Sequence, residues 1–357
     1  MKILITGASG FIGRHVCLAL TQQGHEVIAL MRSPDSLATL RTFVRAGAGA
    51  AERISVLAGD LETPELGLTE WPAGVDCVVH LVARFAWHLP PHEARHTNVT
   101  GSLRVAELAR ALGARLVFVT GFMLANTAHL ERSGIDLLHP DRTRWHRVYR
   151  RLGGYEASKL ESGLATRAFV RQNQMDSVEI QPATVAGHSA TGHIDPAQPL
   201  YALMDNLFQG RMAMIPGSPH HWLPLIPVDT LAALIAAACC HKQPPRTLLA
   251  LDDTTPNLRA LLATLASITG QGAPSYHVPV AILRGLLRVP GVAGLLKVAP
   301  ESLDFIQPQR FDTTVTRRFL SDAGIPVPAF QSYLAASAHY YLNQDNSDEK
   351  IETYASN

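Results

Sequence analysis

A tyrosine and a lysine four residues apart, Tyr155 and Lys159, are the pair in this sequence whose types and spacing could move a proton. On a helix, residues at i and i+4 share one face. A lysine ammonium beside a phenol favours the phenolate and so lowers the pKa of the tyrosine. Such a tyrosine can exchange a proton with a substrate oxygen while a hydride moves at the adjoining carbon. The same spacing also occurs in ordinary surface pairs, so the interpretation depends on context.

The start of the chain supplies that context. The apolar run Ile3–Ile5 predicts a buried strand, and Gly7, Gly10 and Gly13 follow it before apolar residues recur at helical spacing from Ile12. A strand, a glycine turn and a helix together are the setting of a dinucleotide-binding fingerprint. The three glycines would permit the tight turn, the approach of a pyrophosphate and close helix packing, in that order. The helix N-terminus would offer N–H groups to the phosphates.

Arg32, after the second predicted strand, bears on the choice of cofactor. An NAD site usually carries Asp or Glu there, about 20 residues after the glycines, to bind the ribose 2′-hydroxyl. The sequence reads Leu30-Met31-Arg32-Ser33 and holds no carboxylate. Arg32 is either a solvated arginine or a charge-assisted partner of a 2′-phosphate. The missing acid favours NADP, bound as NADPH, over NAD.

Alternating strands and helices would position these groups. Apolar segments predict further strands at 26–31, 54–58, 76–82, 115–120 and 177–181, with helical patterns at 35–44, 94–112 and 155–171. This alternation predicts an α/β fold with a Rossmann-type doubly wound parallel sheet. We expect the Rossmann domain over 1–187, with 222–252 returning to it. A smaller, mostly helical substrate-binding region would cover 188–343, and 344–357 would form a frayed tail.

The composition limits the possible partners. The 357 residues carry a net charge of +1, which gives no electrostatic case for nucleic acid. No apolar run is long enough to predict a transmembrane segment, and the first residues do not read as a signal peptide. The four cysteines lack metal-ligand spacing and read as buried thiols: Cys17, Cys77, Cys239 and Cys240. We therefore expect a cytoplasmic protein that acts on a small molecule and binds no metal, with His80 and His88 as packing or loop residues rather than ligands.

Two further segments have unusual compositions. Between Phe122 and Tyr155, a predicted loop carries many basic residues: Arg142, Arg144, Arg147, Arg150, Arg151, His139 and His146. It is either a solvated basic loop or a clamp for an anionic part of the substrate, such as the phosphate of a pantetheine arm or a sugar nucleotide. The apolar segment 278–298 is expected to pack over the substrate, with contact to a membrane surface as the alternative.

Several motifs occur in an order that resembles one family, the extended short-chain dehydrogenase/reductases. They are Thr6-Gly7-x-x-Gly10-x-x-Gly13, Gly59-Asp60-Leu61, His80-Leu81-Val82-Ala83, Asn98-Val99-Thr100-Gly101, Tyr155-x-x-x-Lys159 and Pro182-Ala183-Thr184-Val185-Ala186-Gly187. They cover the first half of the chain, and a weaker match lies at Arg310-Phe311-Asp312. The stretch 182–192 looks most like the branch that reduces fatty acyl and carrier-bound thioesters.

The resemblance implies roles for the matched residues. Tyr155 would be the general acid/base, and Lys159 would hold the nicotinamide ribose. Asp60 and Leu61 would face the adenine, and Pro182 to Val185 would border the nicotinamide. The full expected cofactor site comprises Gly7, Ser9, Gly10, Phe11, Ile12, Gly13, Arg32, Asp60, Leu61, Ala83, Asn98, Tyr155, Lys159, Pro182, Thr184 and Val185.

The sequence departs from the family at the third catalytic position. The family usually places a Ser or Thr hydroxyl at the end of the fifth strand, and the best match puts Gly121 there, with Thr120 one residue earlier. Because side chains alternate along a strand, Thr120 need not face the substrate. Either Thr120 serves after a shift of the loop, or another group replaces it, or catalysis is impaired. Gln181 also stands where the family often has Arg.

The leading hypothesis is an NADP-dependent oxidoreductase that acts on a carbonyl or hydroxyl carbon, such as an acyl thioester or aldehyde, with Tyr155, Lys159 and Thr120 as catalytic residues. A nucleotide-sugar epimerase or dehydratase on the same fold is one alternative. A non-catalytic NADP-binding sensor or scaffold is another, because a fold does not determine a function. The helices near 94–112 and 155–171 have apolar faces, which in the resembling family pair two subunits, so we expect a homodimer.

Overall fold

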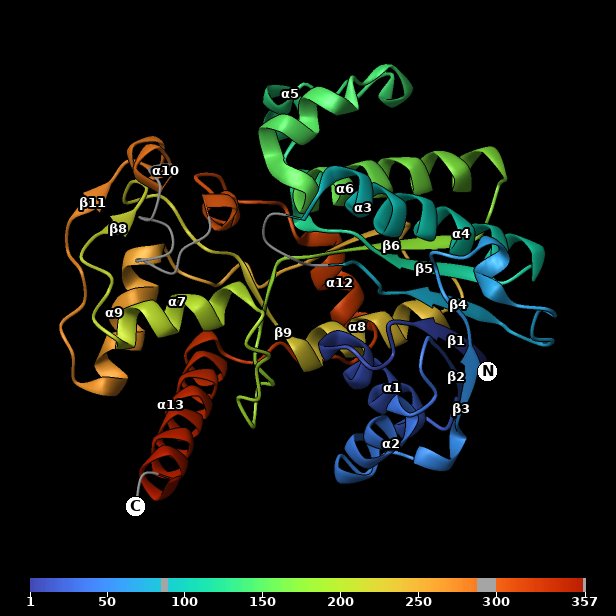
Figure 1. Cartoon of the computed structure of the whole chain (residues 1–357), viewed down its shortest axis with the longest axis horizontal. Coiled ribbons are helices and arrows are strands. Elements are labelled where there is room, and N and C mark those ends of the chain that lie inside the picture. The colour runs from blue at the N-terminus through green and yellow to red at the C-terminus, as the bar shows by residue number, and fades with distance from the viewer. Residues whose placement is uncertain (85–88, 288–299, 356–357) are drawn as a thin grey trace. The chain divides into compact units, whose positions relative to one another are not determined.

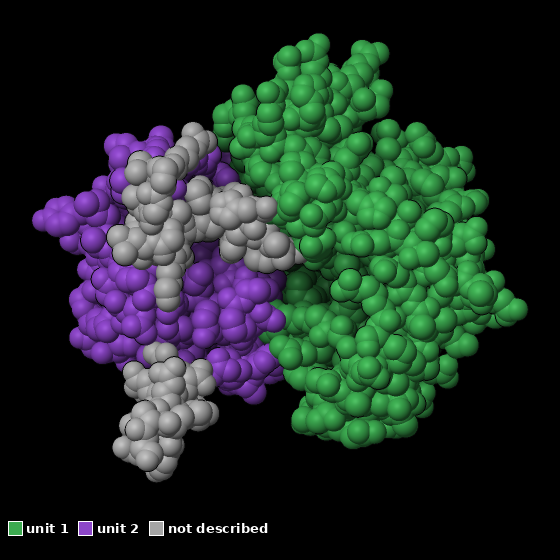
Figure 2. All heavy atoms as spheres, in the orientation of Figure 1, with its two compact units in different colours: residues 1–182, 231–250, 314–325 green, residues 183–230, 251–313, 326–357 purple. Residues whose placement is uncertain are grey.

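The computed structural model describes residues 1–84, 89–287 and 300–355, and the chain divides into two compact units (Figures 1 and 2). Unit 1 comprises residues 1–182, 231–250 and 314–325. Unit 2 comprises residues 183–230, 251–313 and 326–357. The dinucleotide motif and the Tyr155–Lys159 pair both belong to unit 1. Of the helices in the described part of the chain, none is both long and apolar enough to cross a membrane.

Unit 1 is built on a seven-stranded sheet in which every neighbouring pair is parallel. The strands are β1 (Lys2–Thr6), β2 (Glu26–Met31), β3 (Ile54–Ala58), β4 (Cys77–His80), β5 (Arg115–Val119), β6 (Ser177–Pro182) and β10 (Thr247–Ala250). Their order is β10-β6-β5-β4-β1-β2-β3, so the direction of winding reverses between β1 and β4. In sheets of this kind, ligands bind beyond the carboxyl ends of the strands at the reversal. The predicted doubly wound Rossmann fold is confirmed.

Helices cover both faces of this sheet. Figure 1 shows α1 and α2 on one face and α3, α4 and α6 on the other. The helices of unit 1 are α1 (Phe11–Gln22), α2 (Ser36–Ala46), α3 (Pro91–Ala94), α4 (Gly101–Ala111), α5 (Thr127–Ser133), α6 (Trp145–Gln172), most of α8 (Val228–Cys240), and α12 (Thr314–Asp322). A π-helical turn, Arg95–Thr100, joins α3 to α4. The strands bury continuous apolar runs such as Ile3–Ile5, as expected of a sheet covered on both sides.

The segment before Tyr155 differs from the predicted loop. It contains α5, and α6 begins at Trp145 rather than at Tyr155. Gly153 interrupts α6 with φ +82° and ψ 173°, so the helix consists of a short first segment and a long second one. Only glycine adopts such a conformation readily. The last arginines of the basic segment therefore lie on a helix, and a break separates them from Tyr155.

Unit 2 is mostly helical and has its own core. Its helices are α7 (Pro199–Phe208), α9 (Leu258–Thr269), α10 (Val280–Leu287) and α13 (Phe330–Ala355), which includes most of the predicted tail. Two short parallel pairs, β7 (Thr184–Ala186) with β9 (Leu225–Pro227) and β8 (Ile215–Pro216) with β11 (His277–Val278), complete it. Met204, Leu261 and Tyr333 are among its core residues. Residues 288–298 of the predicted apolar covering segment, and His88, lie outside the described residues.

His80 lies in the centre of unit 1, where it joins β1, β4 and α4. Thr6 Oγ1 is 2.7 Å from Nδ1, and Ser102 Oγ is 2.7 Å from Nε2. Ser102 donates its own proton to the Asn98 carbonyl oxygen, so it must accept from Nε2. Nε2 therefore carries a proton. Because burial lowers the pKa of His80 to about 3, the imidazole is neutral at neutral pH. The predicted packing role of His80 agrees with this placement.

This buried imidazole predicts a loss of stability in mild acid. The unfolded chain protonates His80 below about pH 6.5, whereas the folded chain does so only near pH 3. Stability therefore falls as pH drops through that window, by up to about 1.4 kcal/mol per pH unit. Urea unfolding at several pH values should show that His80→Gln loses this part of the pH dependence and that His96→Gln, at an exposed position, keeps it. Equal pH dependence in both variants would contradict the assignment.

Candidate active site

The glycine turn between β1 and α1 fits a dinucleotide. Gly7 has φ +79°, and its carbonyl oxygen accepts a hydrogen bond from the Gly10 amide at 3.1 Å. A Cβ at Gly13 would lie 1.9 Å from that same oxygen, so only glycine allows α1 to pack this closely. α1 begins at Phe11 without a side-chain cap, which leaves its first N–H groups open for phosphate oxygens. The turn thus has the shape and polarity that a pyrophosphate requires.

The residues expected around the adenosine end lie after β2 and β3. Arg32 directly follows β2 and is exposed, and no ion pair engages it in the part of the chain that the structure describes. Asp60 shapes the turn after β3, where its Oδ1 accepts from the Glu62 amide at 3.0 Å. Leu61 is buried beside it. Of the residues at the glycine turn, Ser9 is exposed and Phe11 is buried.

Asn98 connects the segment after β4 to α6. Its Oδ1 accepts from the Arg84 amide at 2.7 Å, and its Nδ2 donates to Ser158 Oγ at 2.9 Å. Ala83 precedes this anchored residue and is half-buried. These bonds fix the chain as it leaves β4, at the reversal of the sheet. The contacts of Asn98 and Ala83 with a cofactor stay predictions.

Tyr155 and Lys159 lie in the second segment of α6, just after the break. A Cβ at Gly154 would come 2.0 Å from the Leu89 carbonyl oxygen, so the chain passes this point only because residue 154 has no side chain. Tyr155 and Lys159 are both half-buried. Lys159 Nζ donates to the Val119 carbonyl oxygen, at the end of β5, over 3.1 Å. The two glycines therefore place Tyr155 at the start of a helix that Lys159 ties to the sheet.

The protonation of this pair differs from the expectation that Lys159 lowers the pKa of Tyr155. Burial raises the pKa of Tyr155 to about 12, and the Glu156 carboxylate adds to the rise. Burial lowers the pKa of Lys159 to about 8, against the opposing effect of the Glu179 carboxylate. Both shifts therefore follow mainly from burial, which disfavours the charged form of either group. At neutral pH Tyr155 is thus a protonated phenol beside a largely charged lysine.

Thr120 is bonded to a carboxylate that sequence reasoning missed. Its Oγ1 donates to Glu179 Oε1 at 2.7 Å. Glu179 is buried in β6 and also accepts from Arg167 of α6, at 2.6 and 3.0 Å, and from Gln181 at 3.1 Å. Gly121 is in an extended conformation, and a Cβ there would meet no atom within 4 Å. The signal for this cluster was a lone Glu within an apolar strand, which requires a partner when buried.

α6 thus brings together most of the predicted catalytic residues. Ser158 binds Asn98, Lys159 binds the end of β5, and a Cβ at Gly163 would lie 3.1 Å from Thr120 Cγ2. Of the segment predicted to border the nicotinamide, Pro182 ends β6 in unit 1, whereas Thr184 and Val185 are buried in β7 of unit 2. Within the described residues, no three His, Cys, Asp or Glu side chains gather in a way that could hold a metal.

Comparison with known proteins identifies the family. Residues 5–235, well over half of the chain, match the NAD-binding family described as male sterility protein. The chain belongs to this family. It is thereby a member of the extended short-chain dehydrogenase/reductases, which include oxidoreductases and epimerases.

Individual proteins are similar to parts of this chain or to its whole fold. UDP-glucose 4-epimerase of Klebsiella pneumoniae is 32% identical over 120 residues, which are 32% of this chain and 84% of the epimerase. Dihydroflavonol 4-reductase of Hordeum vulgare is 26% identical over 200 residues, 55% of this chain and 56% of the reductase. The chain therefore spans about half the length of this second relative. The terminal R domain from the myxalamid PKS-NRPS biosynthetic pathway shares the fold, with a TM-score of 0.73 at 19% identity over 97% of this chain and 91% of that domain.

The hydrogen bond from Thr120 to the buried Glu179 predicts that substitution of Thr120 lowers the stability of the protein. Thr120→Val keeps the shape of the side chain but leaves Glu179 one donor short. We expect the free energy of unfolding to fall by about 1–3 kcal/mol, the usual penalty for a buried group without its partner. Thr100→Val, at an exposed position, should change it by less than about 0.5 kcal/mol. Urea unfolding measures both, and an unchanged stability in Thr120→Val would show that the bond to Glu179 contributes nothing.

Proposed function

We propose that this protein is an NADP-dependent oxidoreductase that reduces or oxidises a carbonyl or hydroxyl carbon, such as an aldehyde or an acyl thioester. The observation that carries the proposal is the place of Tyr155 at the start of the second segment of α6, with Lys159 one turn further on and bonded to the Val119 carbonyl oxygen at the end of β5. When bound at the glycine turn, a nicotinamide dinucleotide supplies or accepts the hydride. Tyr155 transfers the proton at the substrate oxygen.

In the reducing direction, Tyr155 donates its hydroxyl proton to the oxygen that gains charge as the carbon is reduced. The phenolate left behind is costly in a half-buried position, and the Lys159 ammonium beside it lowers that cost. Lys159 is suited to this role because Val119 O orients its Nζ and the Glu179 carboxylate favours its charged form. In the oxidising direction the same groups act in reverse, with Tyr155 as base.

Thr120 enters the proposal as a positioning residue. Its hydroxyl donates to Glu179, and Glu179 acts electrostatically on Lys159. The hydroxyl that the family usually carries at position 121 has no counterpart here, because residue 121 is glycine. The substrate oxygen is then held by Tyr155, with the open space at Gly121 beside the end of β5. The homodimer expected from the apolar helix faces stays a prediction.

The epimerase alternative is favoured by the match to UDP-glucose 4-epimerase. An epimerase returns the hydride to its substrate, so the absorbance of the reduced nicotinamide does not change over a turnover. A reductase consumes NADPH in step with its substrate. Assays with a panel of aldehydes, acyl thioesters and nucleotide sugars, followed by that absorbance and by product analysis, separate the two. Product formation without net NADPH consumption would replace the reductase by the epimerase.

Cofactor choice is predicted from the exposed Arg32. We expect tighter binding of NADPH than of NADH, because Arg32 can pair with the 2′-phosphate and no carboxylate stands there to select the hydroxyl. Arg32→Ala should weaken the binding of NADPH about tenfold, as loss of one charge-assisted contact does. The affinity for NADH should not change. Arg53→Ala, at the exposed last residue of the short helical turn Ala51–Arg53 before β3, serves as a control. Fluorescence titration measures the affinities, and equal binding of the two cofactors would contradict the role of Arg32.

Removal of the Tyr155 hydroxyl should impair chemistry and spare cofactor binding. A positioned acid contributes about 10²–10⁴ in rate, so Tyr155→Phe should lose that factor in kcat on a substrate identified by NADPH consumption. Thr120→Val should retain kcat within about tenfold, in keeping with an indirect role. Tyr276→Phe, at an exposed tyrosine of unit 2, is the matched control. Full activity in Tyr155→Phe would mean that the proposed mechanism is wrong.

A further inference from the structure

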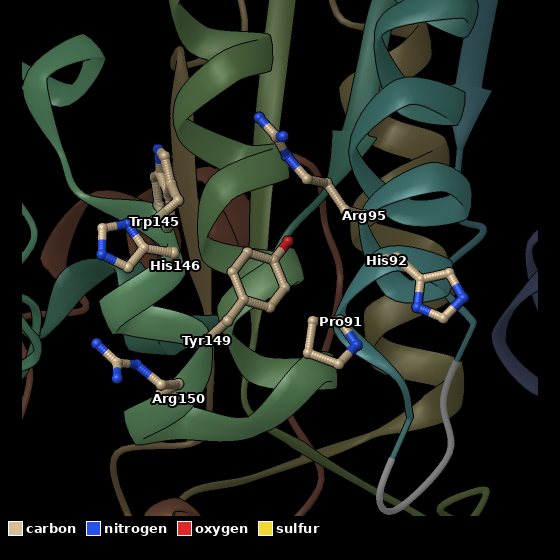
Figure 3. A pocket seen from close by; sticks show the side chains of 7 residues that line it. All are labelled: Pro91, His92, Arg95, Trp145, His146, Tyr149 and Arg150. Carbon is tan, nitrogen blue, oxygen red and sulfur yellow. The ribbon is translucent and has the colours of Figure 1, made fainter.

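A cavity of about 330 Å³ lies between α3 and the first segment of α6, before the break at Gly153 (Figure 3). Its lining residues are Pro91, His92, Arg95, Trp145, His146, Tyr149 and Arg150. Figure 3 shows the Tyr149 ring in the middle, opposite Pro91, with Trp145 and His146 to one side. Arg150 and His92 extend outward at opposite edges. The volume falls in the range of small-molecule sites, and the lining combines flat rings with cations.

Two of the lining residues are held in place by a buried carboxylate. Glu161, in the second segment of α6, is 5% exposed. Its Oε1 accepts from Arg95 Nε and Nη2 at 3.0 and 2.9 Å, and its Oε2 accepts from the Tyr149 hydroxyl at 2.8 Å. The Arg95 side chain is nevertheless 61% exposed, and Nη1 takes no part in this pair. Arg95 is therefore oriented by Glu161 while part of its guanidinium remains available to a ligand.

The other cations of the cavity are Arg150, His146 and His92. All three are exposed, and in the described ranges no ion pair engages them. Along the chain, residues 139–151 contain five arginines and one acid, Asp141, in a protein whose net charge is +1. Like charges held close together on one surface produce a summed positive electrostatic potential, which is strongest in a concave region and attracts anions. The basic segment thus concentrates positive charge beside an aromatic floor.

We propose that this cavity binds a nucleotide: a phosphate ester joined to a flat ring. Arg150, at the edge of the cavity, binds the phosphate, because a guanidinium matches phosphate oxygens with two parallel hydrogen bonds. Arg95, on the other side of the Tyr149 ring, adds positive charge. Trp145 and Tyr149 provide flat apolar surfaces for the ring. The site is separate from the dinucleotide turn, since it lies on α3 and α6, across the sheet from α1 in Figure 1. The inference does not depend on the reductase activity, because nucleotide binding needs no turnover.

Calorimetric titration with ADP tests the proposal. Saturating NADPH first fills the dinucleotide turn, and a separate NADPH titration shows whether that turn binds at all, so failure of the proposed cofactor is seen independently. We expect ADP to bind at one further site and Arg150→Ala to weaken it about tenfold or more, as loss of a charge-assisted pair does. Arg147→Ala is the matched control, because Arg147 is an exposed arginine one turn earlier on α6 that does not line the cavity. It should change ADP affinity by less than about threefold.

Further arms test the ring and the source of the nucleotide. Trp145→Leu should weaken the binding of ADP more than the binding of inorganic phosphate, because only ADP has a ring that can contact Trp145. If coenzyme A binds at least tenfold more tightly than ADP, the natural ligand is the nucleotide part of a substrate carrier. If it does not, the natural ligand is a free nucleotide. The proposal is overturned if ADP does not bind, if Arg147→Ala weakens it as much as Arg150→Ala, or if inorganic phosphate binds as tightly as ADP.

Discussion

The buried carboxylate of Glu179 holds together the elements that carry the proposed catalytic residues. A charge buried within a sheet is tolerated only with full compensation, and here Arg167, Thr120 and Gln181 supply it. These partners tie α6, the end of β5 and β6 to one point. Lys159, two turns before Arg167 on α6, is thereby held against the Val119 carbonyl. Compensation of this one buried charge thus contributes to the position of Lys159, and of Tyr155 one turn before it, relative to the end of β5.

The second constraint is the pair of glycines at the break of α6. Gly153 turns the chain, and Gly154 lets it pass the Leu89 carbonyl. A continuous helix through this point would place the basic first segment in line with Tyr155. The break instead gives each segment its own direction. Glu161 of the second segment accepts from Tyr149 of the first segment and from Arg95 of the π-helical turn. One helix in sequence therefore carries both the residues proposed to transfer a proton, after the break, and part of the basic aromatic cavity, before it.

Burial reverses an expectation drawn from neighbouring charges. From spacing alone, Lys159 should lower the pKa of Tyr155. Instead, the pKa of the phenol is raised and the pKa of the lysine is lowered. Both shifts have the same cause, because a low-dielectric surrounding disfavours the charged form of either group. His80 follows the same rule and remains neutral well below neutral pH. In these three residues, burial thus determines the protonation state at least as much as neighbouring charges do.

The sequence by itself determined the Rossmann sheet, the glycine turn and the placement of Tyr155 and Lys159 on one helix face. These features follow from local periodicity and from glycines whose conformational freedom is a property of single positions. It did not reveal the Thr120–Glu179–Arg167 cluster, the break before Tyr155, or the cavity between α3 and α6. Each of these joins residues distant in the chain, such as Thr120 with Glu179 or Arg95 with Glu161. Only the packed tertiary structure decides which buried charge meets which donor, because burial and partner are set by the fold as a whole.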